Sequence, residues 1–382
     1  MNRARLPSQR DLFAIPQEVC YLNTAYMSPL LESVREAGEA GLAAKSQPWT
    51  ITADHWFGRV ERARELFARL IAATGDDVAL VPSASYGVGT AAANVPLGRG
   101  DRVVLIADQF PSGVYPWRAR AAECEAELVQ VPRPRDLDWT SAILSAIDER
   151  CAVACLPAVH WTDGGAIGLE RIAARLREVD AQLVLDLSQS LGAAEFDVGA
   201  VDPDWLCAPT YKWLLGPYSA GFLYVAPRRQ QGRPLEEGWI VRAGSDDFSR
   251  LVDYVDDYRE GARRFDVGER SNFILVPMVV RALEQILEWS VAGIANTLDQ
   301  VTASLAEIAG RHGLVSIPRE RRGPHLLGLE APGGLPADLI PRLAEDHVYV
   351  GRRGDSLRVA PHLHVTERDL DAFDRALRRT LG

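Results

Sequence analysis

Asp186 and Lys212 are the two residues whose types and spacing point most directly to chemistry. Each follows a short apolar run, 182–185 before the aspartate and 204–208 before the lysine. An aspartate at the end of such a run could pair with a protonated ring nitrogen. A lysine beside apolar and aromatic residues has its ammonium form disfavoured by desolvation, which makes an imine linkage to an aldehyde feasible.

Lysine is scarce in this chain, because only Lys45 and Lys212 occur among its 42 basic residues. Taken alone, Lys212 fits a surface residue whose ammonium group reaches the solvent. The scarcity of lysine and the position of Asp186 favour the chemical role instead. Lys45 follows no predicted strand, and we interpret it as an exposed helix residue.

A third feature is the segment Pro82-Ser-Ala-Ser-Tyr-Gly87, which follows an apolar run and precedes a small-residue helix predicted over 88–94. Amides, hydroxyls and a helix N-terminus together could form a cradle for a phosphate. A plain strand-to-helix turn explains the segment equally well. Gly87 and Gly89 lack the third glycine of a dinucleotide-binding fingerprint.

Arg358 interrupts an apolar strand between Leu357 and Val359, so its side chain should point away from theirs. A guanidinium there could hold a carboxylate through two hydrogen bonds or form a structural ion pair. His362 and His364 follow with i, i+2 spacing, but no third ligand is signalled. We therefore expect no metal site.

The elements that must position these residues alternate between apolar runs and helix-like stretches from residue 76 to 226. This alternation predicts an α/β fold with a mostly parallel, seven-stranded sheet covered by helices on both faces. The predicted strands are Val78 to Val81, Arg102 to Ala107, Glu127 to Val131, Val153 to Val159, Gln182 to Leu187, Asp204 to Ala208 and Gly221 to Val225.

Helices are predicted over 54–73, 168–181 and 276–289. A smaller C-terminal α+β domain should contain strands over 314–317, 325–329, 348–351 and 356–360, with helices over 336–345 and 367–381. The predicted organisation is an N-terminal segment (1–52) contributing to the small domain and the active-site mouth, a large ligand-binding domain (53–290) and a small domain (291–382).

The composition of the 382 residues is that of a globular protein, with 47% hydrophobic and 25% charged residues. No apolar run approaches the ~18 residues of a membrane span. The net charge of −10 makes nucleic acid an unfavourable partner. Five cysteines, an odd number, suit reduced thiols better than a disulfide framework. We expect a cytoplasmic protein that binds neither membranes nor nucleic acids.

Seven segments along nearly the whole chain resemble, in order and spacing, pyridoxal 5′-phosphate (PLP) enzymes of fold type I. The resemblance is to the class V aminotransferase superfamily, which includes cysteine desulfurases, kynureninases and isopenicillin N epimerase-like proteins. The segments are Tyr21 to Ala25, Pro82 to Gly87, His160 to Gly164, Asp186 to Gly192, Thr210 to Gly216, Arg264 to Gly268 and Leu357 to Pro361.

The resemblance implies that Lys212 forms the Schiff base with PLP and that Asp186 pairs with its pyridinium nitrogen, which makes these two the catalytic residues. The cofactor-binding residues that it implies are Ala84, Ser85, Tyr86, Phe110, Thr162, Asp163, Asp186, Gln189, Thr210, Tyr211 and Lys212. Phe110 would stack on the ring, and Gln189 would approach the phenolic oxygen. Ser85 and Tyr86 would bind the phosphate.

Alternatives remain for part of this set. Phe110 and Tyr211 could instead pack in the core, and a type I turn explains Thr162 and Asp163 almost as well. On the substrate side, the resemblance implies that Arg358 binds the α-carboxylate, with Asn23 and Tyr26 nearby.

The implied activity is PLP-dependent chemistry at the Cα of an amino acid, with transamination first. A lyase of kynureninase or cysteine-lyase type comes second, and an epimerase third. Cysteine desulfurases use a mobile cysteine in the C-terminal half of the chain. A desulfurase is disfavoured here because no cysteine follows Cys207. A nucleotide-binding or regulatory protein without catalysis is the non-enzyme alternative.

A homodimer is expected, since fold type I sites commonly form between subunits. Many relatives carry Gly-Thr where this chain has Gly268-Glu269, and that threonine reaches the neighbouring subunit's phosphate. Glu269 would repel a phosphate, so Arg270 or Ser271 could replace the contact. The sequence does not identify the amino-acid substrate.

Overall fold

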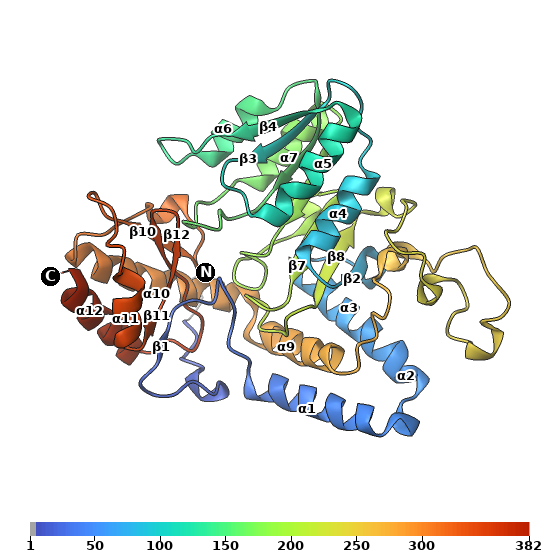
Figure 1. Ribbon diagram of the computed structural model, residues 1–382, viewed down its shortest axis with the longest axis horizontal. Coiled ribbons are helices and arrows are strands. Elements are labelled where there is room, and N and C mark those ends of the chain that lie inside the picture. The colour runs from blue at the N-terminus through green and yellow to red at the C-terminus, as the bar shows by residue number, and fades with distance from the viewer. Residues whose placement is uncertain (1–4, 382) are drawn as a thin grey trace.

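A seven-stranded sheet forms the centre of the larger part of the computed structural model, which describes residues 5–381 (Figure 1). Strand β8 is antiparallel to both of its neighbours, and the other four pairs are parallel. The predicted α/β fold with a mostly parallel sheet is therefore confirmed. In spatial order the strands are β2 (Val78–Val81), β8 (Gly221–Val225), β7 (Trp205–Pro209), β6 (Gln182–Asp186), β5 (Cys151–Leu156), β3 (Arg102–Ile106) and β4 (Glu127–Val131).

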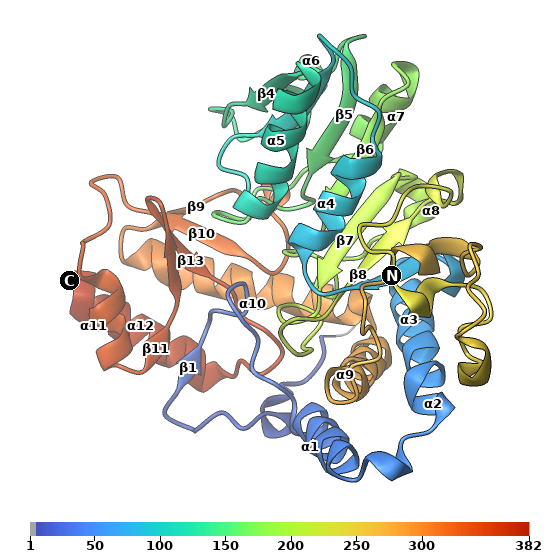
Figure 2. The ribbon, with the colours of Figure 1, turned by 45° about the vertical axis from the view of Figure 1, so that its right-hand side comes forward.

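Helices cover both faces of this sheet, which is why most of its strands read as continuous apolar runs. One face packs on α3 (Gly58–Leu70), α6 (Trp139–Ala146), α7 (Leu169–Glu178) and α9 (Leu275–Trp289). The other face packs on α4 (Ala84–Asn94) and α5 (Tyr115–Cys124), as Figure 2 shows. Alternate residues of each strand enter the two cores, as the two-residue period of a strand requires.

A four-stranded antiparallel sheet forms the smaller part. Its order is β12 (Gly351–Arg353), β13 (Ser356–Val359), β10 (Leu327–Glu330) and β9 (Val315–Ser316). Its apolar face packs on α10 (Val291–Arg311), α11 (Leu339–Glu345) and α12 (Glu367–Leu381). The N-terminal segment reaches this part as β1 (Cys20–Tyr21), which pairs in parallel with β11 (Val348–Tyr349). The opposite face of the four-stranded sheet is directed toward the large part.

The remaining helices are shorter or peripheral. None of the helices within residues 5–381 is long and apolar enough to cross a membrane. These remaining helices are α1 (Glu32–Ser46), α2 (Ala53–Trp56), α8 (Val198–Val201) and the 3-10 helices η1 (Arg10–Leu12), η2 (Pro48–Thr50), η3 (Gly75–Asp77), η4 (Pro111–Gly113), η5 (Pro227–Arg229), η6 (Trp239–Val241), η7 (Phe248–Arg250), η8 (Gly261–Phe265) and η9 (Arg319–Arg321).

Three predicted elements differ from the observed ones. The strand predicted over 348–351 is two strands in two sheets, because β11 pairs with β1 and β12 pairs with β13. The helix predicted over 54–73 is divided at Phe57 into α2 and α3, where Gly58 packs against the Asp54 carboxylate. The helix predicted over 88–94 begins at Ala84, since Ser83 caps it.

The buried apolar side chains form three core clusters, and the division of the chain into domains remains a prediction. One core cluster joins Cys20 and Leu22 to residues between 301 and 377, whereas two others fill the faces of the large sheet. Cys20 and Leu22 of the N-terminal segment thus pack in the core of the small part. The boundaries at 52 and 290 remain predictions, and residues 1–4 and 382 lie outside the described residues.

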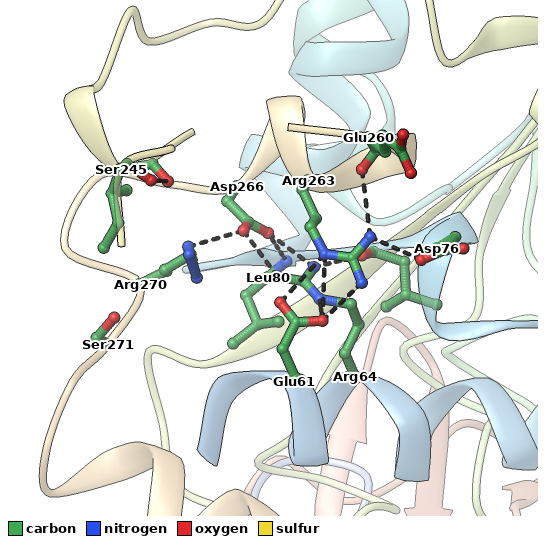
Figure 3. A network of polar contacts seen from close by, with 12 residues as sticks. Glu61, Arg64, Asp76, Leu80, Ser245, Glu260, Arg263, Asp266, Arg270 and Ser271 are labelled. Atoms are coloured by element: carbon green, nitrogen blue, oxygen red, sulfur yellow. Dashed lines mark hydrogen bonds and ion pairs between the residues drawn. The ribbon is translucent and has the colours of Figure 1, made fainter. Parts of the chain in front are cut away.

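A buried ionic network fixes β2 against α3 and the segment after η8 (Figure 3). Arg64 donates to both carboxylate oxygens of Asp266, at 3.0 and 2.8 Å, and the Leu80 amide donates to Oδ1 at 2.8 Å. Arg270 Nε lies 2.9 Å from Asp266 Oδ2, and the side chains of these three charged residues have no exposed surface. One carboxylate thus holds three segments together beside the end of β2.

Candidate active site

The carboxyl ends of β6 and β7 bring Asp186 and Lys212 to one small cavity. The two strands are paired in parallel, with Asp186 opposite Cys207, so the residues that follow them leave the sheet at the same edge. The described residues that line the cavity are Gln109, Phe110, Pro157, Val159, Trp161, Asp186, Ser188, Gln189 and Lys212.

Lys212 is buried, with only 5% of its surface exposed. Its Nζ lies 5.3 Å from the ring centroids of both Phe110 and Tyr211. Burial lowers the pKa of its ammonium group to about 8, the nearby Asp186 opposes this shift, and the cations Arg358 and Arg353 add to it. Roughly a tenth of the amine is therefore neutral and nucleophilic at pH 7, far more than for an ordinary lysine. Lys45 lies exposed in α1, as predicted.

The carboxylate of Asp186 is held in place by the residues that follow it. The Ser188 amide donates to Oδ1 at 2.9 Å, and the Ser188 hydroxyl donates to the same oxygen. Gln189 also lines the cavity, but its side-chain amide has structural partners: Trp213 Nε1 donates to its Oε1 at 3.0 Å, and its Nε2 donates to the Ala25 carbonyl at 3.0 Å. Both residues are thus fixed in direction.

The turn between β2 and α4 places a helix N-terminus beside the strand that leads to the lysine. Ser83 Oγ accepts a hydrogen bond from the Tyr86 amide at 3.1 Å. The Ser85 hydroxyl donates to Ser112 Oγ at 2.7 Å and lies at the surface. A Cβ atom on Gly87 would lie 2.7 Å from Cys207 Cβ, so only glycine permits this approach of α4 to β7. The exposed first turn of α4, including Ala84, suits an anion.

The segment that carries Lys212 is fixed by Thr210. The Thr210 hydroxyl is buried and donates to the Pro217 carbonyl at 2.7 Å, which closes the loop around the lysine. This contact gives Thr210 a positioning role toward Lys212. The Tyr211 ring meets the Tyr218 ring edge to face at 4.7 Å and flanks the amine.

Thr162 and Asp163 do not line the cavity. Thr162 Oγ1 lies 2.8 Å from His160 Nδ1, and the Asp163 carboxylate accepts from the Gly165 amide at 2.8 Å and from Arg133. The residue of this loop that reaches the cavity is Trp161. Sequence analysis missed Trp161, although the segment from His160 to Gly164 that carries it contributed to the family resemblance.

Arg358 lies on the side of β13 that faces the large part, as its position between two core residues predicted. Only 1% of its surface is exposed. Its Nη1 donates to the Trp161 carbonyl at 3.1 Å, whereas Nε and Nη2 are buried and have no hydrogen-bond partner within residues 5–381. Burial, and then repulsion from Arg353, lowers the pKa of this guanidinium to about 9. A buried cation with free donors is suited to an anionic ligand.

Asn23 lies close to Arg358 at the bridge between the N-terminal segment and the small sheet. A Cβ atom on Gly351 would lie 3.1 Å from Asn23 Oδ1 and 3.7 Å from Arg358 Nη2. The Oδ1 atom is buried, with no hydrogen-bond partner in the described part of the chain. Tyr26 follows on the same segment and is 56% exposed. The structure thus places Asn23 beside Arg358, whereas the side chain of Tyr26 lies largely at the surface.

Within the described chain, no group of three His, Cys, Asp or Glu side chains is arranged to hold a metal ion. His362 and His364 are buried near the rings of Trp289 and Phe13, respectively. Burial, and then the neighbouring histidines, lowers the pKa of His362 to about 3. His364 Nε2 lies 2.8 Å from the Tyr21 carbonyl, whereas neither ring nitrogen of His362 has a hydrogen-bond partner among the described residues.

A lysine that is easily made neutral, a fixed carboxylate and a helix N-terminus at the edge of one sheet fit an aldehyde, a protonated ring nitrogen and a phosphate on one cofactor. The Aminotransferase class-V family model matches residues 50–325. The chain belongs to the class V aminotransferase family. Its enzymes use PLP, so the predicted family and cofactor are both confirmed.

Class V relatives align with this chain over most of its length. The uncharacterized aminotransferase YcbU of Bacillus subtilis is 26% identical over 98% of this chain and 99% of its own. The kynureninase of Shouchella clausii is 25% identical over 73% of this chain and 68% of its own. A solved structure of the cystine C–S lyase C-DES, in complex with its product cysteine persulfide, superposes with a TM-score of 0.84 at 17% identity, covering 96% of this chain and 99% of that one.

Proposed function

We propose that this class V enzyme is an aminotransferase that acts at the Cα of an amino acid. The observation that carries the proposal is the buried Lys212 amine, which shares one cavity with Asp186 and lies near the free donors of Arg358. Bound PLP supplies an electron sink for the bonds at the substrate Cα.

The residues of this chain have separate tasks in that reaction. Lys212 Nζ would hold the cofactor covalently, and its amine could take up the Cα proton and return it as a general base and acid. Asp186 favours the protonated form of the ring nitrogen, and Arg358 binds the substrate α-carboxylate with its free Nε and Nη2. The rings of Phe110 and Trp161 meet edge to face at 5.3 Å and shield the amine from water.

The remaining cofactor contacts are also proposals. The first turn of α4, from Ala84 to Tyr86, binds the phosphate, Phe110 stacks on the ring, and Gln189 and Tyr211 border it. Thr210 acts through the lysine loop. For Thr162 and Asp163 we propose a role in holding the Trp161 loop.

Lyase activity is the second candidate, and names among the relatives support it, namely kynureninase and cystine C–S lyase. A route through an enzyme persulfide has no support, because none of the described cysteines lines the cavity. Burial raises the pKa of the Cys155 thiol to about 12, which makes it a poor nucleophile. Epimerisation requires only proton movement at Cα and remains the third candidate.

An amino-acid panel tests the reaction type. The purified holoenzyme is incubated with each amino acid and an oxo-acid acceptor, and the products are identified by mass. Transamination yields the oxo acid of the donor and the amino acid of the acceptor in equal amounts. Products of side-chain cleavage that form without an acceptor would assign a lyase, and inversion at Cα alone would assign an epimerase.

Asp186→Asn tests the carboxylate. We expect the variant to retain cofactor but to lose at least about tenfold in turnover, because an unprotonated pyridine is a weaker electron sink. Ser188→Ala is the matched variant, since it removes one hydrogen bond to Oδ1 and keeps the charge. Its loss should be smaller. Turnover of Asp186→Asn close to that of the parent would contradict the proposed role.

A further inference from the structure

The hairpin formed by β12 and β13 presents a polar face to the large part. Gly351 pairs with Arg358 and Arg353 pairs with Ser356, so the side chains of 353, 356 and 358 lie on one face. Arg352 pairs with Leu357 on the other face, where the leucine enters the core of the small part. Gly351 places no side chain beside Arg358, where a Cβ atom would lie 3.7 Å from Nη2.

Both arginines of this polar face lie over Trp161. The guanidinium carbon of Arg353 is 5.7 Å and that of Arg358 is 5.9 Å from the indole ring. Trp161 also lines the cavity of Lys212, and its Nε1 donates to the Asp108 carbonyl at 2.6 Å, which fixes the ring. The two cations therefore lie against a ring that lines the cavity of the amine, although neither of them lines it.

This cationic face lacks an acidic partner. Within residues 5–381 neither Arg353 nor Arg358 has a carboxylate within ion-pair distance, and Ser356 Oγ is buried with no hydrogen-bond partner. The observed bond of Arg353, from Nη1 to the Arg352 carbonyl at 2.7 Å, is to a neutral group. Arg353 lowers the pKa of both Arg358 and Lys212, so its charge acts on the site.

When Arg358 binds a single α-carboxylate, Arg353 still has no anionic partner. Across an antiparallel pair, diagonal neighbours such as these two arginines lie roughly 7–8 Å apart at Cα, which is within reach of long side chains. A short molecule with an acid group at each end can therefore contact both guanidiniums. Arginine is well suited to each of these contacts because its planar group binds a carboxylate through two hydrogen bonds.

We propose that Arg353 binds a second anionic group of the substrate, and that the substrate is an amino acid whose side chain ends in a carboxylate or a similar oxyacid. This inference rests on the proposed function, because it takes Arg358 as the site of the α-carboxylate. Arg353 is then the residue that determines specificity.

Equilibrium binding of unreactive acids to the holoenzyme tests the proposal. Succinate is compared with butyrate, and glutarate with valerate, so that each pair has the same number of carbons and differs by one carboxylate. Isothermal titration measures the dissociation constants. We expect the diacid of at least one pair to bind about ten- to a hundredfold more tightly, as one charge-assisted hydrogen-bonding group allows.

Arg353→Met should reduce this preference to about threefold or less, whereas Arg353→Lys should keep part of it. The matched control is Arg352→Met, because its guanidinium lies on the other face and donates to the carbonyls of Gly354 and Pro336. This control should bind as the parent does. Equal binding of diacid and monoacid by the parent, or an undiminished preference in Arg353→Met, would overturn the proposal.

The result also separates this inference from the proposed function. If the holoenzyme prefers diacids but transaminates no amino acid, the reaction type is wrong and the second anionic site stands. If it transaminates neutral amino acids and shows no diacid preference, transamination stands and the role of Arg353 is wrong. Comparison of aspartate with asparagine, and of glutamate with glutamine, extends the same test to substrates.

Discussion

The backbone amide of Ser28 donates a 3.0 Å hydrogen bond to the carbonyl of Tyr211, the residue before Lys212. The Ser28 hydroxyl donates to the same carbonyl at 3.2 Å. The N-terminal segment, whose strand β1 also pairs with β11 of the small part, therefore holds the segment that carries the lysine. The position of the amine depends on parts of the chain that are far apart in sequence.

We expect PLP to attach to Lys212 alone. Borohydride reduction of the holoenzyme followed by peptide mapping should place the pyridoxyl mass on the peptide of Lys212, because Lys212 lines the cavity whereas Lys45 is exposed on α1 and does not. Lys45→Arg should keep the visible absorption of the cofactor, and Lys212→Arg should lose it. A label on Lys45 would refute the assignment.

The rate of cofactor attachment should depend on pH through the Lys212 amine. Its pKa is lowered to about 8, so the ammonium form predominates below that pH and the neutral amine above it. The rate at which the apoprotein captures PLP should rise by about tenfold per pH unit below pH 8 and level off above it. Stopped-flow absorbance measures this rate. A rise that continues to the ordinary pKa of lysine would show that burial does not shift this group.

Arg358→Ala should reduce kcat/KM by tens to thousands of times, because truncation of one partner of a buried charged pair costs about 2–5 kcal/mol. Arg358→Lys should also bind substrate weakly, since it offers a point charge in place of two parallel hydrogen bonds. The absorption of bound PLP should change little in either variant. Steady-state kinetics on the true substrate make the measurement, and parental kcat/KM in Arg358→Ala would make this arginine structural.

Asp266→Asn should destabilise the fold by about 3–5 kcal/mol, because the change removes the buried carboxylate that both Arg64 and Arg270 contact and leaves Arg64 only its longer ion pair with Glu61. Urea unfolding monitored by tryptophan fluorescence gives the free energy. Asp76→Asn is the control: Asp76 pairs with Arg263 at the surface, where its side chain is 67% exposed, and its loss should cost less than about 1 kcal/mol. Equal losses of unfolding free energy in the two variants would show that the buried network in Figure 3 does not stabilise the fold more than a surface ion pair does.

The enzyme should form a two-fold symmetric homodimer. The Trp56 ring packs on Trp239, Phe248 and Phe273, and apolar side chains on the adjoining segment, such as Val252 and Tyr254, are 80% and 97% exposed. Light scattering at micromolar concentration measures the mass. Tyr254→Asp should weaken the dimer, and Val315→Asp, at an exposed apolar position on the small part, should not. A monomer with cofactor bound and full activity would contradict the expectation.

The sequence predicted the large sheet well because its strands are buried on both faces and read as short apolar runs with little alternation. It failed at 348–351, where one apolar run is divided between two sheets, because β11 pairs with β1 from the distant N-terminal segment while β12 pairs with the next strand, β13. The positions of Asp186 and Lys212 could be predicted because both follow parallel strands, whose ends meet at one edge.

Other parts of the site required the folded chain. Arg353 lies at a hairpin turn, where a charged residue normally indicates solvent, and only the register with β13 places it beside Arg358. Trp161 reaches the cavity, whereas Thr162 and Asp163 do not, because Thr162 contacts His160 and Asp163 accepts a hydrogen bond from Arg133. The contact of Arg64 with Asp266 joins segments whose separation in sequence leaves no local pattern.

The pairing of β1 with β11 has a consequence for the order in which the molecule is completed. Cys20 pairs with Val348, so β1 has no strand partner until the chain has been synthesised as far as β11. The large sheet needs no residue beyond β8 and can assemble earlier. The pairing of β1 therefore requires β11, whereas the hydrogen bond from Ser28 to the lysine loop joins residues that both precede β11.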